Sequence, residues 1–156
     1  MTTVYRRSHG ADAAALSALL RAFNAEFDAS VPDEAALTRR WRTLLEREDV
    51  LVVLAEHPAP VGFAYLTLRP TPYYDGPLAQ LEELYVVPEL RGQGIGTGMI
   101  TTVVDELRAR GCGEIHINVD EPDTGARRFY ERHGFSNVET EGAGRKYRML
   151  CYIREL

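Results

Sequence analysis

Apolar and polar positions alternate along the chain with two periods, one typical of helices and the other of strands. Between residues 11 and 27, apolar side chains recur every three or four positions, which predicts a helix with one buried face. A second run with this period covers residues 33–48 and has Trp41 near its centre. Residues 3–7, 49–56 and 61–68 are predicted strands. The last two should form a hairpin, because their connection is short and contains two prolines.

The most informative stretch runs from Leu78 to Arg110. An apolar strand ending at Val87 is followed by a short turn and then by a glycine-rich bend that opens a helix with one apolar face. Gly94 and Gly96 lie at this junction, where glycine brings backbone N–H groups close to a helix N-terminus. Such an arrangement favours an anion, typically phosphate.

The spacing of these glycines excludes two common phosphate-binding motifs. The dinucleotide fingerprint needs a third glycine, which would fall at Thr97 or Met99, and the nucleotide P-loop needs a Gly-Lys pair that the sequence lacks. What remains is the pattern Arg-x-x-Gly-x-Gly, from Arg91 to Gly96. On this pattern alone, a tight turn between a strand and a helix explains the glycines equally well.

Downstream of this helix, the pattern predicts one more helix and three more strands. Residues 114–119 form a predicted strand, residues 124–134 a helix, and residues 135–139 and 147–154 a closing pair of strands. Gly111 and Gly134 stand where a left-handed residue would end the preceding helix, so the residue after each should pack back onto it. The element order β-α-α-β-β-β-α-β-α-β-β predicts an α/β fold with a mixed sheet and a helical crossover.

Length, charge and cysteine content narrow the class of protein. The 156 residues predict one domain spanning residues 1–156. A net charge of −5 argues against a large basic face for nucleic acid, and no apolar run approaches the length of a membrane span. We see no signal-peptide pattern, and the two cysteines are far apart, so a reduced, cytoplasmic protein is the simplest interpretation. The histidines show no metal-ligand spacing, and we expect no metal.

Two motifs, in this order, resemble the GNAT superfamily of acetyl-CoA-dependent N-acetyltransferases. The first is the bend from Arg91 to Gly96, and the second is A-x-x-F-Y-x-x-x-G-F at residues 126–135. The resemblance covers roughly residues 50–156 and is specific to the superfamily but not to a substrate. It implies the GNAT fold, a central mixed sheet of about seven strands with four helices and splayed central strands.

The resemblance also implies acetyl-CoA as the acyl donor. Backbone N–H groups of the glycine bend would hold the pyrophosphate, Arg91 would add charge, and the pantetheine arm would run beside residues 85–87, with an oxyanion donor near Val86. The residues implied at the cofactor are Tyr85, Val86, Val87, Arg91, Gln93, Gly94, Ile95, Gly96, Thr97, Asp123 and Arg127. Asp123 stands where many members have Asn, and capping of the following helix explains it equally well.

Amide formation from a thioester needs a group that takes the proton of the amine and a group that protonates the leaving thiolate. Glu82 and Glu83 are the candidate bases, since a free amine has a pKa of about 10 and needs the help of a carboxylate. On a regular strand they face opposite sides, so at most one reaches the site unless a bulge intervenes. The resemblance implies Tyr130 as the acid, and its phenol pKa of roughly 10 suits transfer to a thiolate. A purely structural role of Tyr130 at the end of its helix stays open.

Acidic residues cluster around the first loop between helices. Glu26, Asp28, Asp33 and Glu34, together with Asp75 and the two glutamates of the apolar strand, would form an acidic mouth suited to a cationic amine. A solvated acidic surface explains them equally well.

Together, the resemblance and these residues lead us to expect acetyl transfer to a primary amine of a small cationic molecule, by direct attack in a ternary complex. The alternatives are an acyl-CoA-binding sensor without turnover and an enzyme acting on a protein or peptide amine. A small-molecule amine is the expected partner, with no nucleic acid and no membrane, and a homodimer is left open.

Overall fold

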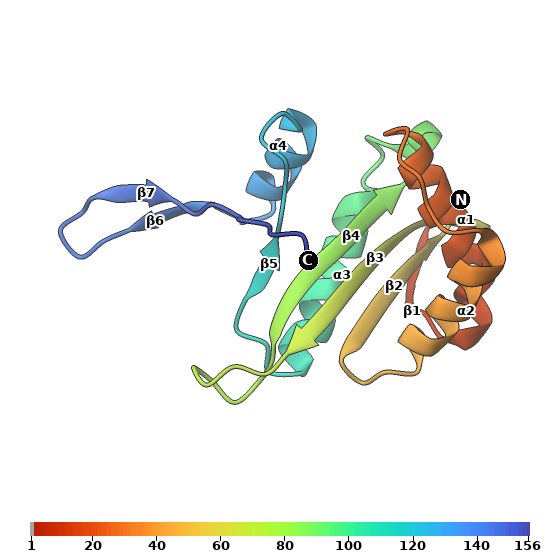
Figure 1. Cartoon of the computed structure of the whole chain (residues 1–156), viewed down its shortest axis with the longest axis horizontal. Helices are drawn as coiled ribbons and strands as arrows, with labels where there is room; N and C mark the ends of the chain where they lie inside the picture. Colours follow the sequence, from red (N-terminus) through yellow and green to blue (C-terminus); the bar gives the residue numbers. More distant parts are fainter. Residues whose placement is uncertain (1) are drawn as a thin grey trace. The chain divides into compact units, whose positions relative to one another are not determined.

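The computed structural model describes residues 2–156, and contacts between Cα atoms divide the chain into two compact units. The first unit ends at Ile117, and the second is Asn118–Leu156. Over the described residues the α/β class holds, with four α-helices, a five-stranded sheet ordered β1-β2-β3-β4-β5 and a separate two-stranded sheet (Figure 1). The expected seven strands are present, but they are divided between two sheets rather than joined in one.

The five strands of the first unit follow the predicted order closely. They are β1 (Val4–Arg7), β2 (Val50–Glu56), β3 (Pro60–Arg69), β4 (Leu78–Val86) and β5 (Ile115–Ile117). The helices are η1 (Gly10–Asp12), α1 (Ala13–Ala25), α2 (Glu34–Leu45), η2 (Pro88–Leu90) and α3 (Ile95–Ala109). Strands β1 to β4 pair antiparallel, whereas β5 pairs parallel to β4 after the crossover through α3, as predicted.

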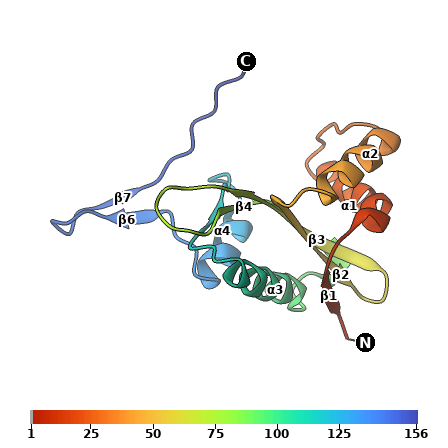
Figure 2. The ribbon, with the colours of Figure 1, turned by 90° about the horizontal axis from the view of Figure 1, so that it is seen from below.

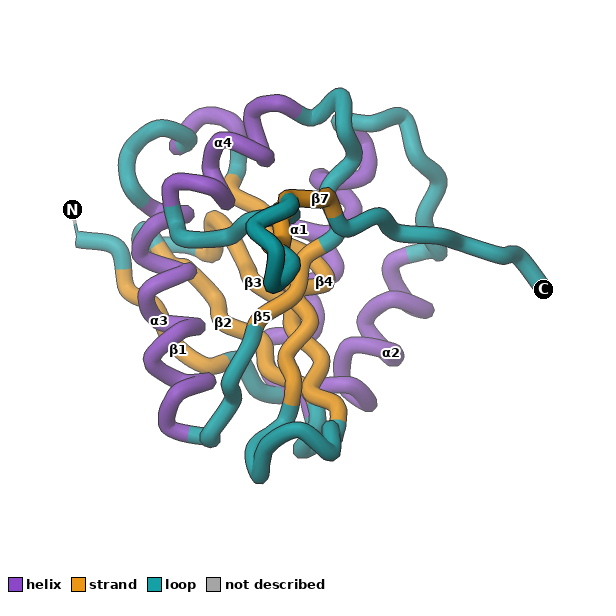
Figure 3. The backbone as a smooth tube through the Cα atoms, turned by 90° about the vertical axis from the view of Figure 1, so that its left-hand side faces the viewer, coloured by secondary structure: helices purple, strands orange, loops and turns teal. Residues whose placement is uncertain are grey.

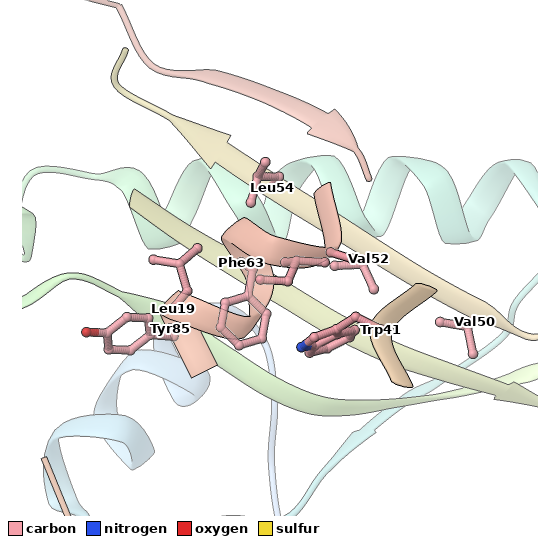
Figure 4. Close-up of a cluster of buried hydrophobic side chains, with 9 residues drawn as sticks. Leu19, Trp41, Val50, Val52, Leu54, Phe63 and Tyr85 are labelled. Atoms are coloured by element: carbon pink, nitrogen blue, oxygen red, sulfur yellow. The ribbon is translucent and has the colours of Figure 1, made fainter. Parts of the chain in front are cut away.

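The sheet buries its two faces against different helices, with α3 on one side and α1 and α2 on the other (Figures 2 and 3). Under α1 and α2, the aromatic side chains of Trp41, Phe63 and Tyr85 form the centre of a buried cluster (Figure 4). On the opposite face, Ile95 and Met99 of α3 pack on strands β2 and β3. The apolar periodicity predicted for these helices is therefore what fixes them to the sheet.

The C-terminal end of α3 confirms the cap that the sequence predicts. Gly111 has a φ of 75°, and its N–H donates to the carbonyl of Arg108 at 3.0 Å. The N–H of Cys112 donates to the carbonyl of Leu107 at 3.0 Å, which completes a Schellman motif. Burial raises the pKa of the Cys112 thiol, so a structural role for this cysteine fits better than a reactive one.

The second unit holds α4 (Thr124–Arg132) and the antiparallel pair β6 (Val138–Thr140) and β7 (Lys146–Arg148). The strand predicted at residues 147–154 is wrong over most of its length, because residues 149–156 are exposed and have no regular structure. Their apolar pattern favours a strand, but β6 is only three residues long and offers them no ladder to extend. No helix within residues 2–156 is both long and apolar enough to cross a membrane.

Candidate active site

A β-bulge interrupts strand β4 at the two candidate bases. Tyr65 of β3 pairs with Glu83, and the register then shifts by one residue, which leaves Glu82 as the extra residue of β4. The Oγ1 atom of Thr67 donates a hydrogen bond to Oε1 of Glu82 at 2.6 Å. Thr67 and Tyr65 lie on the same face of β3, so both glutamates lie on the face that α1 and α2 cover. The bulge therefore brings together two carboxylates that a regular strand would separate.

Glu83 lines a partly open pocket of about 140 Å³ between the sheet and the helices α1 and α2. Arg40 is the other charged residue of its lining, and the remaining residues are apolar or aromatic, namely Leu20, Leu37, Trp41, Leu44 and Tyr65. Burial raises the pKa of the Glu83 carboxyl above its ordinary value of 4.5, and the neighbouring charge of Glu82 adds to this effect. A carboxylate with a raised pKa beside an apolar pocket is suited to accept a proton.

Aromatic rings hold the floor of this pocket in place. Trp41 is only 3% exposed and meets Tyr65 edge to face, with ring centroids 5.2 Å apart. It meets Phe63 at 6.0 Å and an interplanar angle of 81°. Within residues 2–156, its indole nitrogen has no hydrogen-bond partner, and Figure 4 shows this nitrogen on the side toward Phe63. A ring packed in this way offers a ligand an apolar surface rather than a hydrogen-bond donor.

Beyond the bulge, strand β4 has an open edge. Strand β5 pairs with β4 only between residues 79–81 and 115–117, whereas β4 continues to Val86, so the two strands separate as the resemblance implies. The N–H of Val87 donates to the carbonyl of Val61 at 2.9 Å. Because peptide groups alternate in direction along an antiparallel ladder, the N–H and carbonyl of Val86 point away from β3. This edge can therefore pair with an extended ligand or donate to a developing oxyanion.

Arg91 is held against this edge by three contacts. Its Nε atom donates to the carbonyl of Val86 at 2.9 Å, and its Nη2 atom binds the Glu26 carboxylate at 2.7 Å. The guanidinium also lies 5.6 Å from the centroid of the Tyr85 ring. Burial and the Glu26 carboxylate raise the pKa of Tyr85. For Arg91 to bind a phosphate, its side chain would have to exchange the Glu26 carboxylate for the new anion.

The glycine bend at the start of α3 is formed by backbone conformation. Gly92 and Gly94 have φ values of 72° and 84°, and Gly94 is the N-cap of α3. A Cβ atom added at either position would meet no atom within 4 Å, so the positive φ, not a lack of space, requires glycine there. The first turn of any helix leaves N–H groups without an intrahelical partner, and the first turn of α3 carries no acidic residue. These features fit a bound pyrophosphate group.

Three acids of the predicted acidic mouth have local partners around the loop between α1 and α2. Glu26 binds Arg91, Glu34 binds Arg21 at 3.1 Å, and Asp33 caps the first turn of α2. Two of the four acids around the loop between α1 and α2 are therefore neutralised by arginines. The two glutamates of β4 supply the negative charge that remains beside the pocket.

Tyr130, the candidate acid, is 9% exposed and lies near the end of α4 in the second unit. Its carbonyl accepts the N–H of Phe135 at 3.0 Å, the two rings meet with centroids 5.5 Å apart, and Gly134 has a φ of 88°. The predicted Schellman motif is therefore present at this helix end. Capping of the helix uses the ring and the carbonyl of Tyr130, but it does not require the hydroxyl group.

Two further cofactor candidates hold the start of α4. The Asp123 side chain accepts the N–H of Ala126 at 3.0 Å, which is the capping role left open by the sequence. Nη1 of Arg127 donates to the carbonyl of Glu121 at 3.0 Å. Both residues therefore have a structural task, and their contact with a cofactor stays a prediction. Residues 2–156 contain no cluster of histidine, cysteine and acidic side chains that could hold a metal ion.

Sequence reasoning missed the pocket, although one signal of the bulge was present. Leu81 pairs with Leu66 of β3 and Leu84 pairs with Ala64, so both leucines lie on the face of the sheet that α3 covers. The two leucines are three positions apart in the sequence, whereas residues on one face of a regular strand are two or four apart. An odd spacing between apolar residues of one strand indicates an inserted residue. Arg40 and Tyr65 gave no comparable signal, because only the packing of α2 on the sheet brings them to Glu83.

Comparison with known proteins matches residues 16–135 to the acetyltransferase (GNAT) family. Mycothiol acetyltransferase from Saccharopolyspora erythraea is 29% identical over 119 residues, which are 70% of this chain and 37% of that protein. Aminoglycoside N(6')-acetyltransferase type 1 from Klebsiella aerogenes is 33% identical over 91 residues, which are 57% of this chain and 60% of that protein. The chain thus spans less than two thirds of the length of either relative.

Among solved structures, a protein from Arthrobacter sp. FB24 is similar over almost the whole chain. It carries acetyltransferase as a provisional name and is 46% identical in sequence, with a TM-score of 0.88. The match covers 98% of this chain and 96% of that one.

Proposed function

The chain belongs to the acetyltransferase (GNAT) family, and on this premise we propose that it is an N-acetyltransferase that moves an acetyl group from acetyl-CoA to a primary amine. The observation that carries the proposal is the bulge in β4. The bulge puts Glu82 and Glu83 on the same face of β4, where Glu83 lines the pocket, and the open edge of the same strand ends at Val86. Both curated relatives are named for acetyl transfer, and one of them is named for transfer to aminoglycosides.

The glycine bend is the proposed binding site for the phosphates of acetyl-CoA, which supplies a thioester carbonyl for attack by the amine. Backbone N–H groups of Gln93, Gly94, Ile95, Gly96 and Thr97 would donate to the pyrophosphate, and the dipole of the 15-residue helix α3 favours the anion. Arg91 adds its charge once it exchanges Glu26 for a phosphate. Tyr85, Val86 and Val87 flank the pantetheine arm.

Glu83 is the proposed general base. Strand residues rise by about 3.3 Å each, so the backbone of Glu83 lies about 10 Å from that of Val86. A small amine fits between them, with its proton passing to the carboxylate directly or through one water molecule. The N–H of Val86 then stabilises the oxygen on which negative charge develops. Burial and, to a smaller extent, the charge of Glu82 raise the pKa of Glu83, and Glu82 is itself held by Thr67.

Tyr130 is the proposed general acid for the leaving thiolate. A free phenol has a pKa of roughly 10, close to roughly 8.5 for a free thiol, so this pair of groups is suited to proton transfer. The Schellman motif at Gly134 fixes the ring and therefore the position of the hydroxyl group in its unit. Asp123 and Arg127, at the start of the same helix, are the proposed cofactor contacts of the second unit.

Thiol release from acetyl-CoA tests this function directly. The purified chain is mixed with acetyl-CoA and with primary amines that differ in charge and size, and free thiol is followed with a chromogenic disulfide. We expect amine-dependent release, with stoichiometric acetylated amine by mass spectrometry. Binding of CoA by calorimetry without release for any small amine or peptide would contradict the enzyme and support the sensor. Release with peptide amines only would favour the alternative of a protein substrate.

A further inference from the structure

The charges and walls of the pocket beside Glu83 narrow the choice of substrate. We propose that the acceptor is an α-amino acid with an apolar side chain, an inference that rests on the proposed acetyltransferase function. The side chain would lie on the aromatic floor of the pocket, the amine beside Glu83 and the carboxylate against Arg40. This class differs from the small cationic molecule expected from the acidic residues of the sequence.

The walls of the pocket suit an apolar group of modest size. Apart from its two charged residues, the lining comes from leucine, tryptophan and tyrosine side chains. The volume of about 140 Å³ is close to that of a cavity of about 150 Å³ that binds benzene. A branched aliphatic chain or a single ring fills such a space and excludes water from it. A sugar ring with several hydroxyl groups would leave those groups without hydrogen-bond partners on this floor.

Two oppositely charged side chains, Arg40 and Glu83, line this pocket without forming an ion pair with each other. Among residues 2–156, neither Arg40 nor Glu83 has an ion-pair partner, although they share one lining. Over the same residues, Arg40 shares the lack of an ion pair with other exposed arginines such as Arg39, but it lines the pocket and Arg39 does not. Arg40 is thus an unpaired guanidinium at the edge of an apolar pocket, and a guanidinium binds a carboxylate through two parallel hydrogen bonds.

An α-amino acid matches this arrangement because it carries an amine, a carboxylate and a side chain on one carbon atom. A polyamine or an aminoglycoside carries several positive charges and no carboxylate, so Arg40 would repel it. Glu26 and Glu34 are bound to arginines, and Glu83 is the one acid in the pocket lining, so a second or third positive group would meet only apolar or aromatic side chains and Arg40. The pocket therefore favours a substrate with one positive group, one negative group and an apolar body.

Competition between matched acceptors tests the charge requirement. With acetyl-CoA saturating, kcat/KM is measured for L-leucine, L-leucinamide, 3-methylbutylamine, spermidine and tobramycin. Leucinamide keeps the amine and the side chain and lacks only the negative charge. We expect leucine to exceed each of the other four by at least tenfold. A preference for spermidine or tobramycin, or equal rates for leucine and leucinamide, would overturn the substrate class while leaving the acetyltransferase function intact.

Two neighbouring arginines of α2 provide the variant and its matched control. Arg40→Gln should raise KM for leucine at least tenfold and leave KM for 3-methylbutylamine unchanged, since that amine has no carboxylate. Arg39→Gln removes the same charge from an exposed residue that does not line the pocket, and it should behave as the wild type. If both variants change KM equally, the effect is the loss of general positive charge and Arg40 is not a carboxylate site.

Binding can also be measured without turnover. Trp41 is the single tryptophan of the chain and lies in the pocket floor, so its fluorescence reports occupancy of this site. With CoA present in place of acetyl-CoA, L-leucine should change the emission of the wild type and of Arg39→Gln at concentrations at least tenfold lower than for Arg40→Gln. If leucine changes the emission saturably but the chain releases no thiol from acetyl-CoA, the proposed function is contradicted and the assignment of the pocket is supported. An emission unaffected by leucine at millimolar concentration would overturn the pocket assignment itself.

Discussion

The two sides of the candidate site are built from different parts of the polypeptide. On the donor side, the bend from Arg91 to Gly96 offers backbone N–H groups, and its shape depends on glycines with positive φ. On the acceptor side, the pocket depends on side chains that α1, α2, β3 and β4 each contribute. A contiguous motif encodes the first side, whereas tertiary packing and one inserted residue produce the second. Substitutions should therefore act through conformation on the donor side and through chemistry on the acceptor side.

The largest effect should come from the acceptor side, at Glu83. Glu83→Gln keeps the size of the side chain and removes the proposed base, so kcat should fall by about 10² to 10⁴-fold. The affinity for acetyl-CoA should stay the same, because the change lies outside the glycine bend. Steady-state rates and calorimetric titration with acetyl-CoA check both statements. Glu82→Gln is the control, and a larger loss in that variant would exchange the roles of the two glutamates.

A second large effect should separate catalysis from helix capping at Tyr130. Tyr130→Phe keeps the ring contact with Phe135 and removes only the hydroxyl, so stability should fall by no more than ~1 kcal/mol for a buried hydrogen bond. Loss of a general acid should lower the single-turnover rate about 10²-fold. The rate is measured by rapid quench on a preformed acetyl-CoA complex, because product release can limit kcat. An unchanged single-turnover rate would show that Tyr130 caps the helix and does not act as the general acid.

A charge placed on the donor side should act on binding alone. Gly96→Glu puts a carboxylate into the first turn of α3, where it competes with the phosphates for the same N–H groups. The dissociation constant of acetyl-CoA should rise more than tenfold, equivalent to roughly 1.4 kcal/mol or more. Titration calorimetry measures it, and circular dichroism checks that the fold persists. Wild-type affinity in this variant would refute the glycine bend as the phosphate site.

The smallest effect tests whether conformation is what the bend requires. Gly94→Ala places a Cβ atom in open space but at a φ of 84°, which costs a non-glycine residue about 1–2 kcal/mol. The same substitution at Gly10, which also has open space but no positive φ, should change the free energy of unfolding by less than about 0.5 kcal/mol. Urea unfolding of both variants provides the comparison, and equal effects would mean that the backbone at Gly94 is not special.

Much of the fold could be predicted from the sequence, because local rules govern it. The periods of apolar residues gave α1 to α4 and β1 to β5 within a few residues, and the caps at Gly111 and Gly134 follow from one residue type at one place. The last strand failed because its apolar residues need a partner strand, and a sequence pattern does not state whether one is present. The glycine bend is formed by consecutive residues, so its motif can be recognised in the sequence. This motif predicted the GNAT family, which the family comparison confirms.

The acceptor side was harder to predict for a physical reason. The side chains of Glu82 and Glu83 share one face only because of the bulge, and an alternating pattern predicts the opposite. The acidic mouth expected from composition is only partly present as free charge, because Arg21 and Arg91 neutralise two of its members. Composition counts charges, but ion pairs depend on which side chains the fold brings within 4 Å of each other.

The pH dependence of turnover tests the paired glutamates most directly. Burial and the charge of Glu82 raise the pKa of Glu83, so kcat/KM should rise with pH through a limb that lies above the ordinary value of 4.5. The ionisation of the amine gives a separate limb, near a pKa of about 10. Glu82→Gln removes the neighbouring negative charge, so it should move the lower limb to lower pH, while Glu83→Gln should abolish that limb. A lower limb that persists in Glu83→Gln, or that moves to higher pH in Glu82→Gln, would contradict the account.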